Sequence, residues 1–174
     1  LLLCSIVKSY KNQNYSKMTG LPSNGKAVTI KKMFSRETVI SIDIEAEKSI
    51  IWALLTNASD YPRWNSTVIS IHGAITKGRK IQLKSTLDPK RIFKLSVKEF
   101  EADNKLVWGG AMGKRIYTLK SIGSRLTNFS MNEKIGGPIF PLFSTMIPSF
   151  DKSFARDLKK EAEIISNTKE PVIV

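Results

Sequence analysis

From Glu37 to Ile44, apolar residues alternate with polar ones. This period of two predicts a strand with one buried face. Between Ile50 and Leu55 the spacing of apolar residues becomes helical, which predicts a short amphipathic helix with acidic residues in its first turn. A second helical turn is expected around Tyr61 to Trp64, so the domain opens with a strand followed by two short helices.

The middle of the chain holds short apolar segments separated by turn residues such as Gly, Asp-Pro and Asp-Asn. Regular spacing of this kind is typical of an antiparallel sheet built from hairpins. The expected strands are Val68–Ile75, Lys80–Ser85, Arg91–Glu101, Lys105–Gly109, Lys114–Ser121 and Leu126–Ile135.

The segment from Pro138 to Ser166 places apolar residues four apart, on one face of a long helix. Pro148 should kink this helix or delay its start to near Ser149. A long apolar helix face needs a partner, and in a chain with one sheet that partner is the concave side of the sheet. The order of elements therefore predicts an α+β domain.

Residues 34–168 are expected to form this single domain, with an N-terminal extension at 1–33 and a tail at 169–174. The extension is expected to be flexible because it is rich in Lys, Asn, Ser and Gly. The one cysteine, Cys4, excludes an internal disulfide and is compatible with a reducing, cytoplasmic environment.

Five segments resemble motifs of the START-like (Bet v 1-like) superfamily, also called SRPBCC, in its polyketide cyclase/dehydrase and lipid-transport branch. The first strand and helix, Ile42–Trp52, resemble the start of that family, although Glu47 stands where proline is usual. Asp60–Asn65 is similar to its Tyr-Pro-x-Trp-Asn turn. Leu106–Gly110 resembles a strand with Leu-x-Trp-x-Gly, Thr127–Gly136 the last strand, and Phe154–Glu163 the end of the C-terminal helix.

The resemblance implies the helix-grip fold, in which a curved antiparallel sheet wraps around a long C-terminal helix and encloses a cavity. It implies no particular reaction, because one fold carries many functions. Side chains on inward faces of the strands and the helix are the candidates for contact with an apolar ligand. These candidates, each of which has a purely structural role as its alternative, are Trp64, Trp108, Tyr117, Leu119, Phe129, Met131, Met146, Phe150 and Phe154.

Glu133 is the weak candidate for catalysis. A carboxylate on the last strand that points into an apolar cavity would gain a raised pKa and act as an acid or base. The alternative is an ordinary strand charge paired with a nearby lysine. His72 is the single histidine, and no cluster of Cys and His accompanies it, so neither a metal nor a cofactor is predicted.

Three functions remain open from the sequence. The first is a carrier or sensor of a hydrophobic molecule such as a lipid, polyketide or isoprenoid, without catalysis. The second is a cyclase or dehydratase that uses the same cavity. The third uses the net charge of +13 to bind an anionic partner. Because the basic residues are scattered in pairs, weak association with an anionic membrane is compatible with them and nucleic-acid binding is disfavoured.

Overall fold

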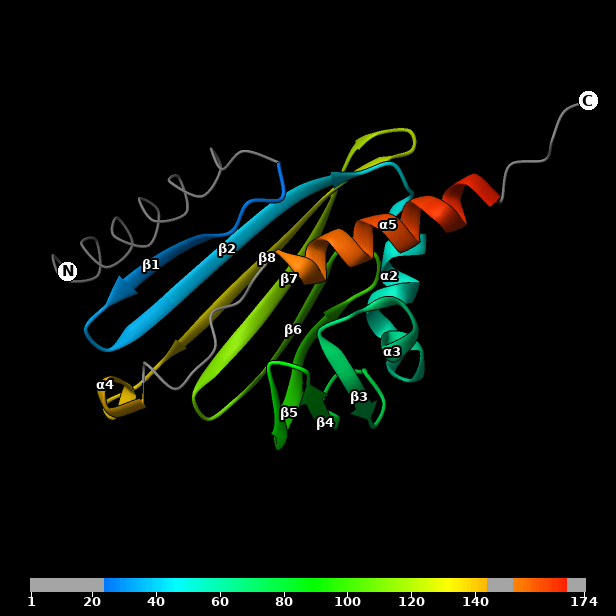
Figure 1. Cartoon of the computed structure of the whole chain (residues 1–174). Coiled ribbons are helices and arrows are strands. Elements are labelled where there is room, and N and C mark those ends of the chain that lie inside the picture. The colour runs from blue at the N-terminus through cyan, green and yellow to red at the C-terminus, as the bar shows by residue number, and fades with distance from the viewer. Residues whose placement is uncertain (1–23, 144–151, 169–174) are drawn as a thin grey trace, which may run out of the picture.

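The computed structural model describes residues 24–143 and 152–168 of the chain (Figure 1). In this part, eight strands form one curved antiparallel sheet with the spatial order β1-β2-β8-β7-β6-β5-β4-β3. The strands are β1 (Val28–Lys32), β2 (Ser35–Ile44), β3 (Val68–His72), β4 (Lys80–Ser85), β5 (Asp88–Glu101), β6 (Lys105–Gly110), β7 (Gly113–Gly123) and β8 (Leu126–Gly136).

Strands β3 to β8 pair in chain order, as successive hairpins do. The exception to neighbour pairing is β8, which lies beside β2 with Ile40 opposite Met131. This long-range pair joins the beginning of the domain to its last strand. The six strands expected between Val68 and Ile135 are all present, with bounds that shift by a few residues.

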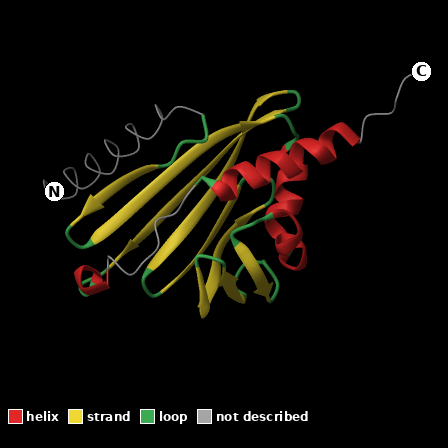
Figure 2. Cartoon of the chain, in the orientation of Figure 1, coloured by secondary structure: helices red, strands yellow, loops and turns green. Residues whose placement is uncertain are grey.

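The C-terminal helix lies on the concave side of the sheet, and the shorter helices lie at its two ends (Figure 2). α2 (Lys48–Thr56), the 3-10 turn η1 (Ala58–Asp60) and α3 (Tyr61–Trp64) follow β2, and α4 (Phe140–Phe143) follows β8. The last helix, α5 (Ser153–Thr168), packs against β2, α2 and α3. The predicted helix-grip α+β architecture is therefore confirmed.

One face of α5 is buried and the rest is polar, which explains why this segment forms an amphipathic helix. Phe154, Leu158 and Ala162 are inaccessible to solvent and contact the core beneath. Polar contacts also fix the helix, because the Lys159 ammonium donates to the Asp43 carbonyl (2.8 Å) and Arg63 Nη1 to Glu161 Oε1 (2.5 Å). The helix is thus attached to both the sheet and α3.

Two details differ from the sequence expectations, and a third agrees with them. Strand β1 lies within residues 1–33, the range assigned to a flexible extension, and it pairs with β2 along its whole length. In α2, Glu47 precedes the helix and the first turn contains no acidic residue, so that prediction is wrong. The C-terminal helix is described from Ser153, close to the delayed start near Ser149 that Pro148 suggested.

No helix in residues 24–143 and 152–168 is long and apolar enough to cross a membrane.

Candidate functional site

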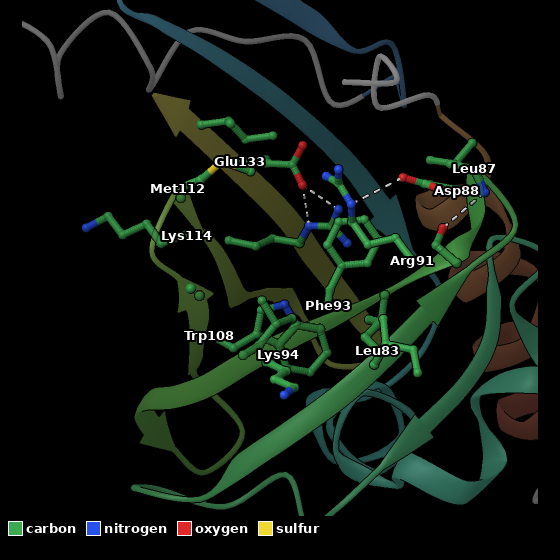
Figure 3. A pocket seen from close by; sticks show the side chains of 18 of the residues that line it. Leu83, Leu87, Asp88, Arg91, Phe93, Lys94, Trp108, Met112, Lys114 and Glu133 are labelled. Atoms are coloured by element: carbon green, nitrogen blue, oxygen red, sulfur yellow. Dashed lines mark hydrogen bonds and ion pairs between the residues drawn. The ribbon is translucent and has the colours of Figure 1, made fainter. Parts of the chain in front are cut away.

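A cavity of about 580 Å³ lies against β4 to β8 (Figure 3). Its volume lies within the range of roughly 300–1,000 Å³ that is usual for small-molecule sites. The wall is formed by parts of β4 to β8 and by the β4–β5 and β6–β7 turns. The lining residues are Thr67, Val68, Leu83, Ser85, Leu87, Asp88, Arg91, Ile92, Phe93, Lys94, Leu95, Trp108, Gly109, Gly110, Ala111, Met112, Gly113, Lys114, Arg115, Glu133 and Ile135.

Most of this wall is apolar, because alternate residues of neighbouring strands share one face. Leu83 lies opposite Phe93 in the β4–β5 pair, and Trp108 lies opposite Arg115 in the β6–β7 pair. In Figure 3, Leu83, Phe93 and Trp108 surround the cavity, and Glu133 lies across from them. The cavity therefore offers a mainly apolar surface with a charged pair on one side.

The charged pair consists of Arg115 on β7 and Glu133 on β8, which are directly opposite each other in the sheet. Arg115 Nε donates to Glu133 Oε2 (2.9 Å), and Nη2 donates to the same oxygen. The two side chains are only 21% and 15% exposed. Because Glu133 is engaged by an arginine, the expected lysine partner is wrong, although the expected ion pair is present.

The Tyr117 phenol extends this pair toward the core, and its Oη lies 3.4 Å from Arg115 Nη1. Burial lowers the pKa of Arg115, but interactions with Glu133 and Tyr117 together outweigh burial and raise that pKa above its ordinary value. Burial also raises the pKa of Tyr117 to about 12, against the opposing effect of Arg115. At neutral pH the cavity wall thus holds a fixed cation at Arg115, and the neutral Tyr117 phenol lies behind it in the core.

A second ion pair lies at the mouth of the cavity. Arg91 Nε is 3.6 Å from Asp88 Oδ2, and the Arg91 guanidinium lies over the Phe93 ring at 5.8 Å from its centroid. Both partners are accessible to solvent, so this pair contributes little to stability. It does place charge beside the apolar entrance.

The strand bearing Trp108 ends in Gly109-Gly110, and this pair is required for packing. A Cβ added at Gly109 would lie 2.4 Å from the Gly113 carbonyl oxygen, and one at Gly110 would lie 3.1 Å from the Lys94 carbonyl oxygen. Only glycine permits this close approach of three strands. The Trp-Gly-Gly segment therefore builds the floor of the cavity.

Of the residues predicted from the sequence, Trp108 and Glu133 line the cavity. Met146 and Phe150 lie outside the described residues. The others do not line the cavity and belong to the closed core: Trp64, Tyr117, Leu119, Phe129, Met131 and Phe154. Their contact with a ligand stays a prediction.

Aromatic packing explains why this part of the concave face is closed. The Phe154 ring centroid on α5 is 5.7 Å from that of Trp64 and 5.6 Å from that of Tyr117. Tyr61 joins the same cluster at 4.9 Å from Trp64, and its hydroxyl donates to the Leu55 carbonyl (2.8 Å). These rings fill the concave face between α3 and α5, and the cavity lies beside them, lined by Trp108 and Arg115.

The sequence prediction missed Arg115 and the apolar side chains of β4 and β5. Arg115 belongs to a Lys-Arg pair that was attributed to the solvated surface. Its position two residues before the inward-facing Tyr117 was the available signal, because residues i and i+2 share a face of a strand. Leu83 and Leu95 also alternate with polar residues along their strands, and this alternation indicates an inward-facing position.

No group of three or more Cys, His, Asp or Glu side chains in the described ranges is placed to hold a metal ion. His72 is exposed near the end of β3 and does not line the cavity.

Comparison with known proteins places this geometry in a structural class. No protein-family model matches the chain, and no curated protein matches it. Solved structures do. A START superfamily protein from Mycobacterium smegmatis aligns with a TM-score of 0.56 over 74% of this chain and 98% of its own, at 13% identity.

A conserved protein of unknown function from Enterococcus faecalis, EF2215, aligns with a TM-score of 0.59 at 13% identity, covering 86% of this chain and 82% of its own. DynU16, a protein encoded in the dynemicin biosynthetic locus, gives 0.55 at 14% identity over 77% of this chain and 49% of its own. The protein is thus a helix-grip domain. Its fold is that of the START-like superfamily.

Proposed function

We propose that the protein binds a hydrophobic small molecule with one polar end in the cavity between β4 and β8, as a carrier or sensor. The observation that supports this most is the cavity itself, whose wall is mainly apolar and contains the partly buried pair Arg115–Glu133. Each CH₂ group that a ligand buries there contributes roughly 0.8 kcal/mol. A lipid, polyketide or isoprenoid chain gains affinity in this way with few polar contacts.

The polar end is expected to meet Arg115 and Glu133, because these are the partly buried charges of the wall. Both hydrogen bonds that Arg115 donates to Glu133 end on Oε2, so the pair is fixed in orientation before a ligand enters. A prearranged polar group costs less to organise on binding than a mobile one. A hydroxyl or carboxyl group suits this position.

Two measurements test the proposal. Native mass spectrometry of the purified protein, followed by denaturing extraction, identifies any molecule that is bound. Titration with the apolar fluorophore N-phenyl-1-naphthylamine then measures binding to the emptied protein. A bound apolar molecule, or saturable fluorophore binding at one site per chain, supports the proposal.

A double variant locates the site. Leu83→Trp with Leu95→Trp narrows the cavity, and if each indole displaces about one CH₂ of ligand contact, affinity for the fluorophore falls roughly tenfold. The matched control is Ile69→Trp, since Ile69 is 38% exposed on β3 and does not line the cavity. Equal affinity in the double variant and the control, with both folded, contradicts the placement.

A cyclase or dehydratase reaction is the second candidate, and the observation that favours it is the carboxylate of Glu133 on the cavity wall. In that case Glu133 transfers a proton to or from a bound substrate. Once extraction has identified a ligand, turnover of that compound is the measurement. Loss of turnover in Glu133→Gln with binding retained supports the reaction, and an unchanged rate excludes this role.

A further inference from the structure

Exposed apolar side chains are concentrated at one end of the described structure. Of the twelve large hydrophobic residues that are exposed in the described ranges, nine lie in the segments 28–37, 86–94, 110–115 and 133–142. The most exposed are Leu142 (77%) and Met33 (75%). Isolated exposed hydrophobic residues are ordinary, but such a concentration indicates an interaction surface.

These four segments are far apart in sequence and adjacent in space. Gly137 N–H donates to the Phe34 carbonyl (3.0 Å), and Gly136 N–H donates to the Met112 carbonyl (2.9 Å). Figure 1 shows the β1–β2 and β6–β7 turns and α4 at the end of the sheet away from α2 and α3, and the close approach of Gly110 to the Lys94 carbonyl joins the β5 segment to the β6–β7 turn. We call the apolar residues at this end the rim: Met33, Phe34, Leu87, Met112, Ile139 and Leu142.

Part of the rim lies at the cavity. Leu87 and Met112 belong to it and also line the cavity, so apolar surface continues from the interior to the outside. The exposed residues lie on separate turns rather than on one flat face. Apolar side chains on projecting turns can enter a layer of lipid headgroups individually.

The same end of the molecule is strongly basic. The four segments contain nine Lys and Arg residues and three Asp and Glu residues, a formal net charge of +6. Lys32 lies directly before Met33 and Phe34, and Lys90 follows the turn that holds Leu87; both lysines are exposed. Lysines beside apolar tips are placed to contact phosphate groups while the apolar side chains insert.

We propose that the rim docks on the surface of an anionic phospholipid bilayer, with the cavity entrance facing the lipid. Charge complementarity favours an anionic surface. The exposed apolar side chains favour a bilayer over a nucleic acid, because a nucleic acid has no apolar layer into which they can insert. In this orientation a hydrophobic molecule passes between bilayer and cavity without crossing water. Docking depends on the outer residues alone and does not require an occupied cavity.

Co-sedimentation with vesicles tests docking. The chain should bind vesicles of phosphatidylcholine mixed with phosphatidylglycerol, and bind phosphatidylcholine alone far more weakly. Lys32→Ala with Lys90→Ala should reduce the partition coefficient by about fivefold for each lysine. Phe34→Glu with Leu142→Glu should reduce it by about tenfold or more, because apolar contact is lost and like charge is added.

Matched controls keep the result specific. Ile122→Glu and Ile164→Glu change exposed hydrophobic residues (45% and 50%) away from the rim, and Lys120→Ala with Lys160→Ala removes the same charge elsewhere. These controls should bind vesicles like the unchanged protein. Equal losses in rim and control variants, vesicle binding that is insensitive to Phe34 and Leu142, or no binding to anionic vesicles would each overturn the proposal.

The fluorophore titration separates this inference from the proposed function. A rim variant that keeps its affinity for N-phenyl-1-naphthylamine while losing vesicle binding supports docking as a separate activity. A chain that takes up the fluorophore and ignores vesicles has a binding cavity without the docking surface, and the inference is then wrong.

Discussion

Oδ2 of Asp157 accepts hydrogen bonds from both the backbone N–H (2.9 Å) and the hydroxyl (2.6 Å) of Ser66. The first residue belongs to α5 and the second to the connection between α3 and β3. One carboxylate oxygen therefore holds the C-terminal helix to the segment that follows the Tyr-Pro-Arg-Trp turn. This contact fixes α5 over the closed end of the concave face.

Removal of this contact should destabilise the fold. We expect Asp157→Ala to lower the free energy of unfolding by about 1–2 kcal/mol, since hydrogen bonds to a charged acceptor are stronger than neutral ones but this pair is accessible to solvent. Urea denaturation measures the loss. Lys160→Ala, an exposed change on the same helix, is the control, and equal stability of the two variants would contradict a role for the contact.

The Arg115–Glu133 pair predicts unequal effects of single and double changes. Glu133→Gln leaves a partly buried guanidinium without its counter-charge and should cost about 2 kcal/mol, below the 3–5 kcal/mol of a fully buried pair. Arg115→Met combined with Glu133→Leu removes both charges and should cost less than either Arg115→Met or Glu133→Leu alone. A double-mutant cycle in urea checks this, and strict additivity would show that the two charges are not coupled.

The buried Tyr117 predicts a loss of stability at high pH. Burial raises the pKa of its phenol from 10.0 to about 12 in the folded protein, so the unfolded chain releases this proton at lower pH than the folded one. The contribution to stability is complete below about pH 10 and is lost as pH rises toward about 12. Unfolding free energies measured from about pH 9 to about pH 11 should therefore decline less steeply in Tyr117→Phe than in the unchanged protein.

The buried Tyr61, whose pKa is also raised well above its ordinary value, contributes in the same direction. A slope that stays the same in Tyr117→Phe would mean that other groups account for the decline.

Two glycines predict different costs for one added methyl group. At Gly109 a Cβ would lie 2.4 Å from a backbone oxygen, so Gly109→Ala requires the β6–β7 hairpin to shift and should cost about 2–3 kcal/mol. At Gly78 nothing lies within 4 Å, and only its positive φ of 80° opposes a side chain, at about 1 kcal/mol. Thermal unfolding of the two alanine variants checks the order, and a larger loss at Gly78 would be contrary to it.

The strands were predictable because alternation and turn residues occur together in this chain. Strand β1 was not, because all five of its residues are exposed and its sequence shows no buried face. An edge strand of this kind is held by main-chain pairing with β2, which leaves no hydrophobic pattern to detect. The helix-grip architecture, in contrast, depends on inward faces that the pattern reveals.

The site was predictable only in part, because a period of two identifies the inward face of a strand but not the position of a cavity along it. Phe129 and Glu133 share an inward face of β8, yet the first is in the core and the second lines the cavity. The Tyr117 ring stacks on Phe129 and on Phe154 of α5 (6.0 and 5.6 Å between ring centroids), so the position of α5 helps to close the sheet over Phe129. The position of α5 depends on tertiary contacts, so the local sequence of β8 does not reveal it.

The pairing of β2 with β8 also affects how the chain folds. Residues such as Ile40 and Met131, about ninety positions apart, must meet before the centre of the sheet is complete. Domains dominated by such distant pairs fold in milliseconds to seconds rather than microseconds. During synthesis, the apolar strand Ser35–Ile44 therefore waits for its main partner until almost the whole domain has left the ribosome, and it is the segment most exposed to aggregation in that interval.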